Sequence, residues 1–257
     1  MTDILVNIEE GVARVTLNRP AQRNALTYAM WNGLDKVFGD LGRDPSVKAV
    51  VLTGAGTDFT AGADIAEFAE IRDDADQARA YEVAVDLGCD AILRCPKAVI
   101  AACKGYTLGG GMHVAMSADF RFAPQEAQFG IPAARLSIVY GVQATRKLMA
   151  LVGLTEAKRI LYGGRRFDAG HALKVGLIDR ITADPLEEAI RFARDLATGS
   201  APLTIGGAKY ILNGAAIGGG FDADEAERLI DAAAASADYR EGRAAFAEKR
   251  QPQFRGH

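Results

Sequence analysis

The sequence has few cysteines and lacks a long apolar run. Its three cysteines are an odd number without a Cys-x-x-Cys spacing, which argues against a disulfide framework and against a zinc site. No stretch approaches the roughly 20 apolar residues that a membrane-spanning helix needs, and residues 1–10 lack the basic start of a secretory signal. We therefore expect a cytoplasmic protein that binds no metal ion and does not associate with a membrane.

An excess of charge of one sign is also absent. The chain carries 30 Lys and Arg against 33 Asp and Glu, a formal net charge of −3, which is too balanced for a protein that binds nucleic acid through phosphates. The hydrophobic fraction of 49% and the charged fraction of 25% are those of an ordinary globular protein and exclude intrinsic disorder. A length of 257 residues predicts one main domain of about 200 residues with a smaller appendage.

The apolar pattern predicts short strands that alternate with helices, which indicates an α/β layer architecture. We expect a helix after its capping residue Thr27 and a long helix over residues 185–198. From Ser200 onward helices dominate, interrupted by a hinge at Gly218, Gly219 and Gly220. The expected strands cover residues 4–8, 12–17, 49–53, 98–103, 119–123 and 178–181.

Two segments rich in small residues carry the strongest chemical signal. Residues 60–65 and 105–111 each follow a buried strand and precede a helix. Backbone N–H groups at such junctions have no intrahelical partner, and glycine lets a ligand approach them. Two of these groups directed at one point would form an oxyanion hole; the alternative is that the glycines only permit tight turns. The spacing fits neither a P-loop nor a dinucleotide-binding fingerprint.

Six motifs together resemble the enoyl-CoA hydratase/isomerase (crotonase) superfamily, over nearly the whole chain. They lie at residues 18–26, 61–65, 105–111, 127–132, 172–179 and 246–250. The resemblance implies a spiral of ββα repeats over residues 1–199. It also implies a C-terminal helical region over residues 200–257 that forms a homotrimer or a dimer of trimers.

The resemblance also implies the ligand, an acyl-CoA thioester whose coenzyme A arrives with the substrate, so that no permanently bound cofactor is expected. The N–H groups of Ala63 and Gly110 match the two donors that hold the thioester oxygen while an enolate forms. Phe246 and Lys249 match positions that reach the CoA of a neighbouring subunit. The residues expected to line the CoA groove are Arg23, Asn24, Ala25, Leu26, Ala61, Gly62, Asp64 and Ile65.

The sequence departs from the family at the catalytic positions. Hydratases of this family place two glutamates around one water, and those positions are His113 and Ala133 here. Because both carboxylates are missing, we do not expect efficient hydration by the paired-carboxylate route. Dehalogenase-like members carry an aspartate nucleophile where this chain has Gly141, so that chemistry is not expected either.

Two other side chains are candidates for proton transfer. His113 has an ordinary pKa near neutrality and can replace one carboxylate, or it fills space in the core. Tyr140 lies where decarboxylating members have a tyrosine, and it either donates a hydrogen bond or shapes the pocket. We therefore expect an acyl-CoA isomerase or a decarboxylase of malonyl-type acyl-CoA that uses His113 and Tyr140. A non-catalytic acyl-CoA binding protein is the alternative.

Overall fold

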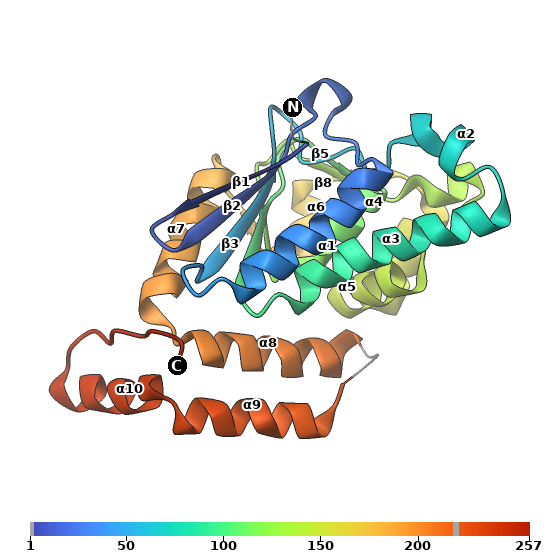
Figure 1. Ribbon diagram of the computed structural model, residues 1–257. Coiled ribbons are helices and arrows are strands. Elements are labelled where there is room, and N and C mark those ends of the chain that lie inside the picture. The colour runs from blue at the N-terminus through green and yellow to red at the C-terminus, as the bar shows by residue number, and fades with distance from the viewer. Residues whose placement is uncertain (1–2, 218–220) are drawn as a thin grey trace.

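The computed structural model describes residues 3–217 and 221–257, so the predicted hinge at Gly218, Gly219 and Gly220 lies outside the described residues. A six-stranded sheet forms the centre of the chain (Figure 1). Its first two strands pair antiparallel, and every other neighbouring pair is parallel. In spatial order the strands are β1 (Ile4–Glu9), β2 (Val12–Leu17), β3 (Ala49–Gly54), β4 (Ala98–Ala102), β6 (Phe120–Ala123) and β9 (Arg180–Ile181).

The central strands β3 and β4 are buried along their whole length, because both faces of the sheet are covered there. In β3, Val50 and Leu52 belong to the larger core, on the face of helices α1 (Tyr28–Arg43) and α3 (Ala75–Arg94). Ala49 and Val51 belong to a smaller core beneath helix α7 (Pro185–Gly199). Successive side chains of a strand point to opposite faces, so one apolar run supplies both cores. The predicted α/β layers are confirmed.

Ten α-helices and three short 3₁₀ helices are found in the described residues. Thr27 caps α1, as predicted, because its side chain accepts a hydrogen bond from the Met30 nitrogen. The α-helices are α1 (Tyr28–Arg43), α2 (Phe68–Ile71), α3 (Ala75–Arg94), α4 (Gly110–Ser117), α5 (Val142–Gly163), α6 (Ala169–Lys174), α7 (Pro185–Gly199), α8 (Pro202–Ile217), α9 (Ala223–Ala235) and α10 (Ala237–Glu248). The 3₁₀ helices are η1 (Pro20–Gln22), η2 (Ile65–Glu67) and η3 (Pro132–Leu136).

A second, smaller sheet of β5 (Tyr106–Leu108), β7 (Gln128–Gly130) and β8 (Arg166–Asp168) positions the start of α4. The segment at 105–111, expected to lie between a strand and a helix, therefore itself contains a three-residue strand and the first residues of a helix. Strands this short give no detectable periodicity in a sequence. Two isolated parallel bridges, Leu26 to Ala63 and Thr60 to Thr107, tie the neighbouring loops to this sheet.

The C-terminal helices α8, α9 and α10 lie along one side of the sheet-containing body (Figure 1). A cavity of about 580 Å³ separates part of α8 and α9 from the ends of α1 and α3, and Lys209 and Arg94 are among its lining residues. Among the described residues, no helix combines the length and the apolar character required to cross a membrane. The cytoplasmic location stays a prediction.

Candidate active site

The two junction segments predicted to meet do lie against each other. A Cβ atom placed on Gly62 would lie 3.0 Å from the nitrogen of Gly110, and a Cβ on Gly110 would lie 3.5 Å from the nitrogen of Ala63. Gly62 has a φ of +96°, and a side chain there would also lie 2.5 Å from the Leu108 carbonyl oxygen. Only glycine fits this position, because both the backbone conformation and the space exclude a side chain.

The N–H groups of Ala63 and Gly110 are available to a ligand. The bridge to Leu26 uses the carbonyl of Gly62 and the nitrogen of Asp64, so the Ala63 N–H points away from Leu26 in the alternating pattern of extended backbone. Gly110 is the first residue of α4, where the N–H has no intrahelical acceptor. Within residues 3–217 and 221–257, no hydrogen bond from either nitrogen to a protein acceptor is found. This arrangement can bind a carbonyl oxygen that becomes negative.

Tyr140 and His113 lie next to these donors. The Tyr140 hydroxyl donates to the Gly109 carbonyl oxygen at 3.0 Å. The rings of Tyr140 and His113 pack edge to face with centroids 6.5 Å apart. Burial raises the pKa of Tyr140 well above its usual value, so the hydroxyl keeps its proton at neutral pH.

His113 belongs to a buried polar cluster between α3, α4 and α5. The Lys147 ammonium donates to His113 Nε2 at 3.1 Å, to Ser117 Oγ at 3.0 Å and to Asp90 Oδ1 at 3.1 Å. Burial, and then the Lys147 charge, hold the pKa of His113 well below its usual value. Because Lys147 can only donate, Nε2 is the acceptor and the imidazole is neutral.

The N-terminal residues expected to line the CoA groove come together, but several of their side chains are occupied. The Asn24 amide donates to the carbonyls of Ala55 and Asp58 at 2.9 and 2.8 Å. Asp64 forms an ion pair with Arg19 at 2.8 Å and caps η2. The Arg23 guanidinium is exposed and lies 4.8 Å from the Tyr106 ring centre. Ala25, Leu26, Ala61 and Gly62 lie in the same two loops, and Ile65 is the first residue of η2.

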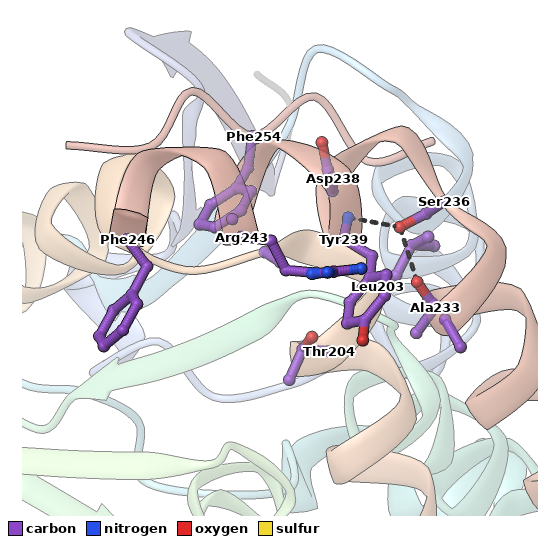
Figure 2. A pocket seen from close by; sticks show the side chains of 12 residues that line it. Leu203, Thr204, Ala233, Ser236, Asp238, Tyr239, Arg243, Phe246 and Phe254 are labelled. Atoms are coloured by element: carbon purple, nitrogen blue, oxygen red, sulfur yellow. Dashed lines mark hydrogen bonds between the residues drawn. The ribbon is translucent and has the colours of Figure 1, made fainter. Parts of the chain in front are cut away.

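Phe246 and Lys249 do not join this group within one chain. They lie at the end of α10, at the opposite side of the molecule from the loop that follows β2 (Figure 1). Phe246 is 88% exposed. It lies at one edge of a cavity of about 600 Å³ between the start of α8, the end of α9 and α10, at the opposite end from Ser236 (Figure 2).

Two carboxylates near the site were missed by the sequence reasoning. Glu82 lies on α3, pairs with Arg72 at 2.8 Å, and has its other oxygen 3.7 Å from where a Cβ of Gly141 would be. Burial raises the pKa of Glu82 and of Asp86, one helical turn further along. The acidic residues at i, i+4 and i+8 (82, 86 and 90) on an otherwise apolar helix face were the available signal.

A metal site is not indicated by the described residues, where no group of three or more His, Cys, Asp or Glu side chains is arranged to hold an ion. The donors at the site are instead backbone amides, which suit an anionic oxygen.

Comparison with known proteins agrees with this geometry. The enoyl-CoA hydratase/isomerase family model matches residues 7–257. A protein of Mycobacterium bovis named "Probable enoyl-CoA hydratase" is 35% identical over 257 residues, which cover 98% of this chain and 97% of that protein. The 2,3-dehydroadipyl-CoA hydratase of Escherichia coli is 33% identical, with 100% of both chains covered.

Solved structures of this family also resemble the chain closely. The enoyl-CoA hydratase of Bacillus anthracis superposes with a TM-score of 0.88 at 31% identity, and 100% of each chain is covered. The predicted resemblance is therefore confirmed on sequence and on structure. The chain belongs to the enoyl-CoA hydratase/isomerase family and has the crotonase fold.

Proposed function

We propose that this enzyme binds an acyl-CoA thioester with the carbonyl oxygen between the N–H groups of Ala63 and Gly110, and catalyses a reaction that passes through the enolate. The observation that carries the proposal is the pair of neighbouring backbone donors for which the described residues supply no acceptor. Such donors favour the enolate over the neutral thioester, because charge develops on the oxygen only as the reaction proceeds.

The reaction class we propose is isomerisation or decarboxylation rather than hydration. In decarboxylation, the bond between Cα and the carboxylate carbon breaks, CO₂ leaves, and the electron pair moves to the thioester oxygen. The enolate then takes a proton from solvent at Cα, which gives the shortened acyl-CoA. In isomerisation, a Cα proton goes to a base and later returns to Cγ. Neither reaction needs two carboxylates around one water, and Ala133 supports this choice because it cannot transfer a proton.

Glu82 is our candidate for the base in isomerisation. Its carboxylate lies beside Gly141, which follows Tyr140 in the chain, and partial burial raises its pKa above the usual value although the Arg72 charge opposes this. The sequence-based alternative, His113, requires its bond from Lys147 to break before Nε2 accepts a proton. Comparing Glu82→Gln with His113→Gln separates the two, since the variant that removes the base slows exchange of the Cα proton about 100-fold or more.

Mass spectrometry of a mixed acyl-CoA pool incubated with the protein in D₂O tests the function. We expect deuterium at Cα of saturated thioesters, or loss of CO₂ from malonyl-type ones. Acyl-CoA binding without any mass change would favour the non-catalytic binding protein, and absence of binding would overturn the proposal. Hydration of crotonyl-CoA as the fastest reaction would contradict the importance of the missing glutamates.

We also propose that Phe246 and Lys249 complete the CoA site of a neighbouring subunit in a homotrimer or a dimer of trimers. The exposure of Phe246 and its distance from its own chain's groove support this. Phe246→Ser is expected to raise KM for acyl-CoA about tenfold, as expected for loss of a buried aromatic contact. Tyr162→Ser, on the exposed face of α5, is the matched control. Sedimentation showing a monomer at assay concentrations would contradict the assembly.

A further inference from the structure

The Tyr140 hydroxyl contacts the peptide unit that carries one of the two oxyanion donors. It donates to the Gly109 carbonyl oxygen at 3.0 Å, and the same oxygen accepts from the Met112 nitrogen at 3.0 Å. A carbonyl oxygen has two lone pairs, so these two donors fill both. The nitrogen of this peptide unit belongs to Gly110.

The carbonyl and the N–H of one trans peptide are rigidly linked and point in opposite directions. No cis peptide bond occurs in the described parts of the chain, so the Gly109–Gly110 unit is trans. A group that holds the Gly109 carbonyl therefore also sets the direction of the Gly110 N–H.

Gly109 itself contributes little to that direction. It has φ of +52° and ψ of −118°, and a Cβ there would meet nothing within 4 Å. Such a residue rotates easily unless hydrogen bonds hold it. The Gly109 nitrogen donates to the Gly130 carbonyl at 2.9 Å, which fixes the peptide before Gly109. The peptide after Gly109 is held at its carbonyl by Tyr140 and by the first turn of α4.

We propose that Tyr140 is a positioning residue for the oxyanion hole: by holding the Gly109 carbonyl, its hydroxyl orients and polarises the Gly110 N–H. This proposal rests on the proposed function, because it assigns a task only if Gly110 binds a thioester oxygen. Hydrogen bonding to a carbonyl strengthens the N–H of the same amide as a donor. Tyr140 thus increases the binding of the enolate more than that of the neutral thioester.

The surroundings of Tyr140 suit a fixed donor. Its own carbonyl accepts a hydrogen bond from Thr145 Oγ1 at 3.3 Å, which ties it to the start of α5. Its ring packs on the edge of the His113 imidazole. Burial raises the pKa of the phenol well above its usual value, so the donor is present at neutral pH. Because the hydroxyl proton is already donated to Gly109, it is not free for a carboxylate on the acyl group.

The test compares wild type, Tyr140→Phe and Tyr81→Phe. Tyr81 is the matched control because its buried hydroxyl bonds the Trp31 side chain at 2.8 Å instead of the backbone of α4. The probe is butyryl-CoA labelled with ¹³C at the thioester carbonyl. Its infrared stretching frequency on the protein reports polarisation by the oxyanion donors, and deuterium exchange at Cα reports enolate formation.

We expect the wild-type protein to lower the carbonyl frequency on binding, and Tyr140→Phe to reduce that shift. The exchange rate at saturation should fall about 5- to 10-fold with little change in KM, the effect of losing one hydrogen bond. Tyr81→Phe should leave the carbonyl frequency unchanged. A wild-type shift retained in full by Tyr140→Phe would overturn the positioning role alone, whereas no shift in wild type would overturn the proposed function.

A second comparison separates positioning from direct substrate contact. If Tyr140 is a positioning residue, Tyr140→Phe should lower the turnover rate of methylmalonyl-CoA and the Cα exchange rate of butyryl-CoA by the same factor. Both reactions pass through an enolate oxygen held by the same two amides. A loss confined to methylmalonyl-CoA would show that the hydroxyl binds the acyl carboxylate, and would overturn the proposal.

Discussion

The two ends of helix α4 handle their polar groups in opposite ways. At the N-terminus, the N–H of Gly110 lies beside that of Ala63, and neither has a protein acceptor within the described residues. One turn later, His113 and Ser117 are buried and bonded to the Lys147 ammonium. Unsatisfied donors cost stability, and they persist where a ligand satisfies them. The comparison is therefore consistent with the proposed binding role of the first end and with structural support at the second.

The largest expected effect is at the N-terminal end. Gly110→Pro removes the N–H at the first helical position, where proline is tolerated, and should slow exchange at Cα about 10²- to 10³-fold. Gly110→Ala is the control. Its Cβ lies as close to the Trp31 ring, 3.1 Å, as the Cβ of proline would, but the alanine variant keeps the N–H. Equal losses in both variants would show that crowding, and not the donor, is responsible.

The next effect is at the structural end. Lys147→Met leaves Asp90, Ser117 and His113 without their shared donor and should lower the free energy of unfolding by about 3 kcal/mol, measured by urea denaturation. Lys158→Met, on the exposed side of the same helix, should change it by less than about 0.5 kcal/mol. A stable Lys147→Met protein would remove the basis for the comparison.

A smaller effect concerns pH. The pKa of His113 is lowered in the folded state, whereas the unfolded chain takes up a proton below pH of about 6.5. Stability is therefore lost as the pH falls from about 6.5 toward the folded pKa, and this group should contribute a loss of about 1.4 kcal/mol between pH 7.5 and 5.5. His113→Gln should lack that component when unfolding is measured at the two pH values. An identical pH dependence in both proteins would contradict a neutral His113.

The smallest expected effect, that of Ser117→Ala, tests whether the two ends of α4 act independently. Ser117→Ala removes the hydroxyl that accepts from Lys147 and donates to the His113 carbonyl, and should cost about 1 kcal/mol of stability. The exchange rate at Cα should stay at the wild-type value. If exchange instead slows in proportion to the lost stability, then the two ends of α4 are coupled.

Much of the fold follows from local patterns in the sequence. The apolar runs at 49–53 and 98–103 identify strands covered on both faces, and Thr27 identifies the start of a helix, because these signals depend only on neighbouring residues. The small strands β5, β7 and β8 escaped detection, since three residues show no period and pair only with distant partners.

The polar contacts of the site could not be predicted from local patterns in the sequence. Lys147 looks like a surface residue of a long helix, yet it is 1% exposed and bonds partners 30 to 57 residues away in sequence. Glu82 matched no family motif and was signalled only by the spacing of acidic residues on α3, and Tyr140 gave no indication that its hydroxyl reaches Gly109. Such contacts depend on how whole helices pack.

The sequence by itself determined the layered architecture and the family, and it singled out the two junction segments whose amides we propose as oxyanion donors, since glycine motifs and strand-to-helix junctions are local features. Only the tertiary structure decided that His113 is neutral and held by Lys147, and that Tyr140 contacts the Gly109 peptide. The physical reason is that burial and hydrogen-bond partners, which set a group's charge and proton, come from segments that meet only when the chain is folded.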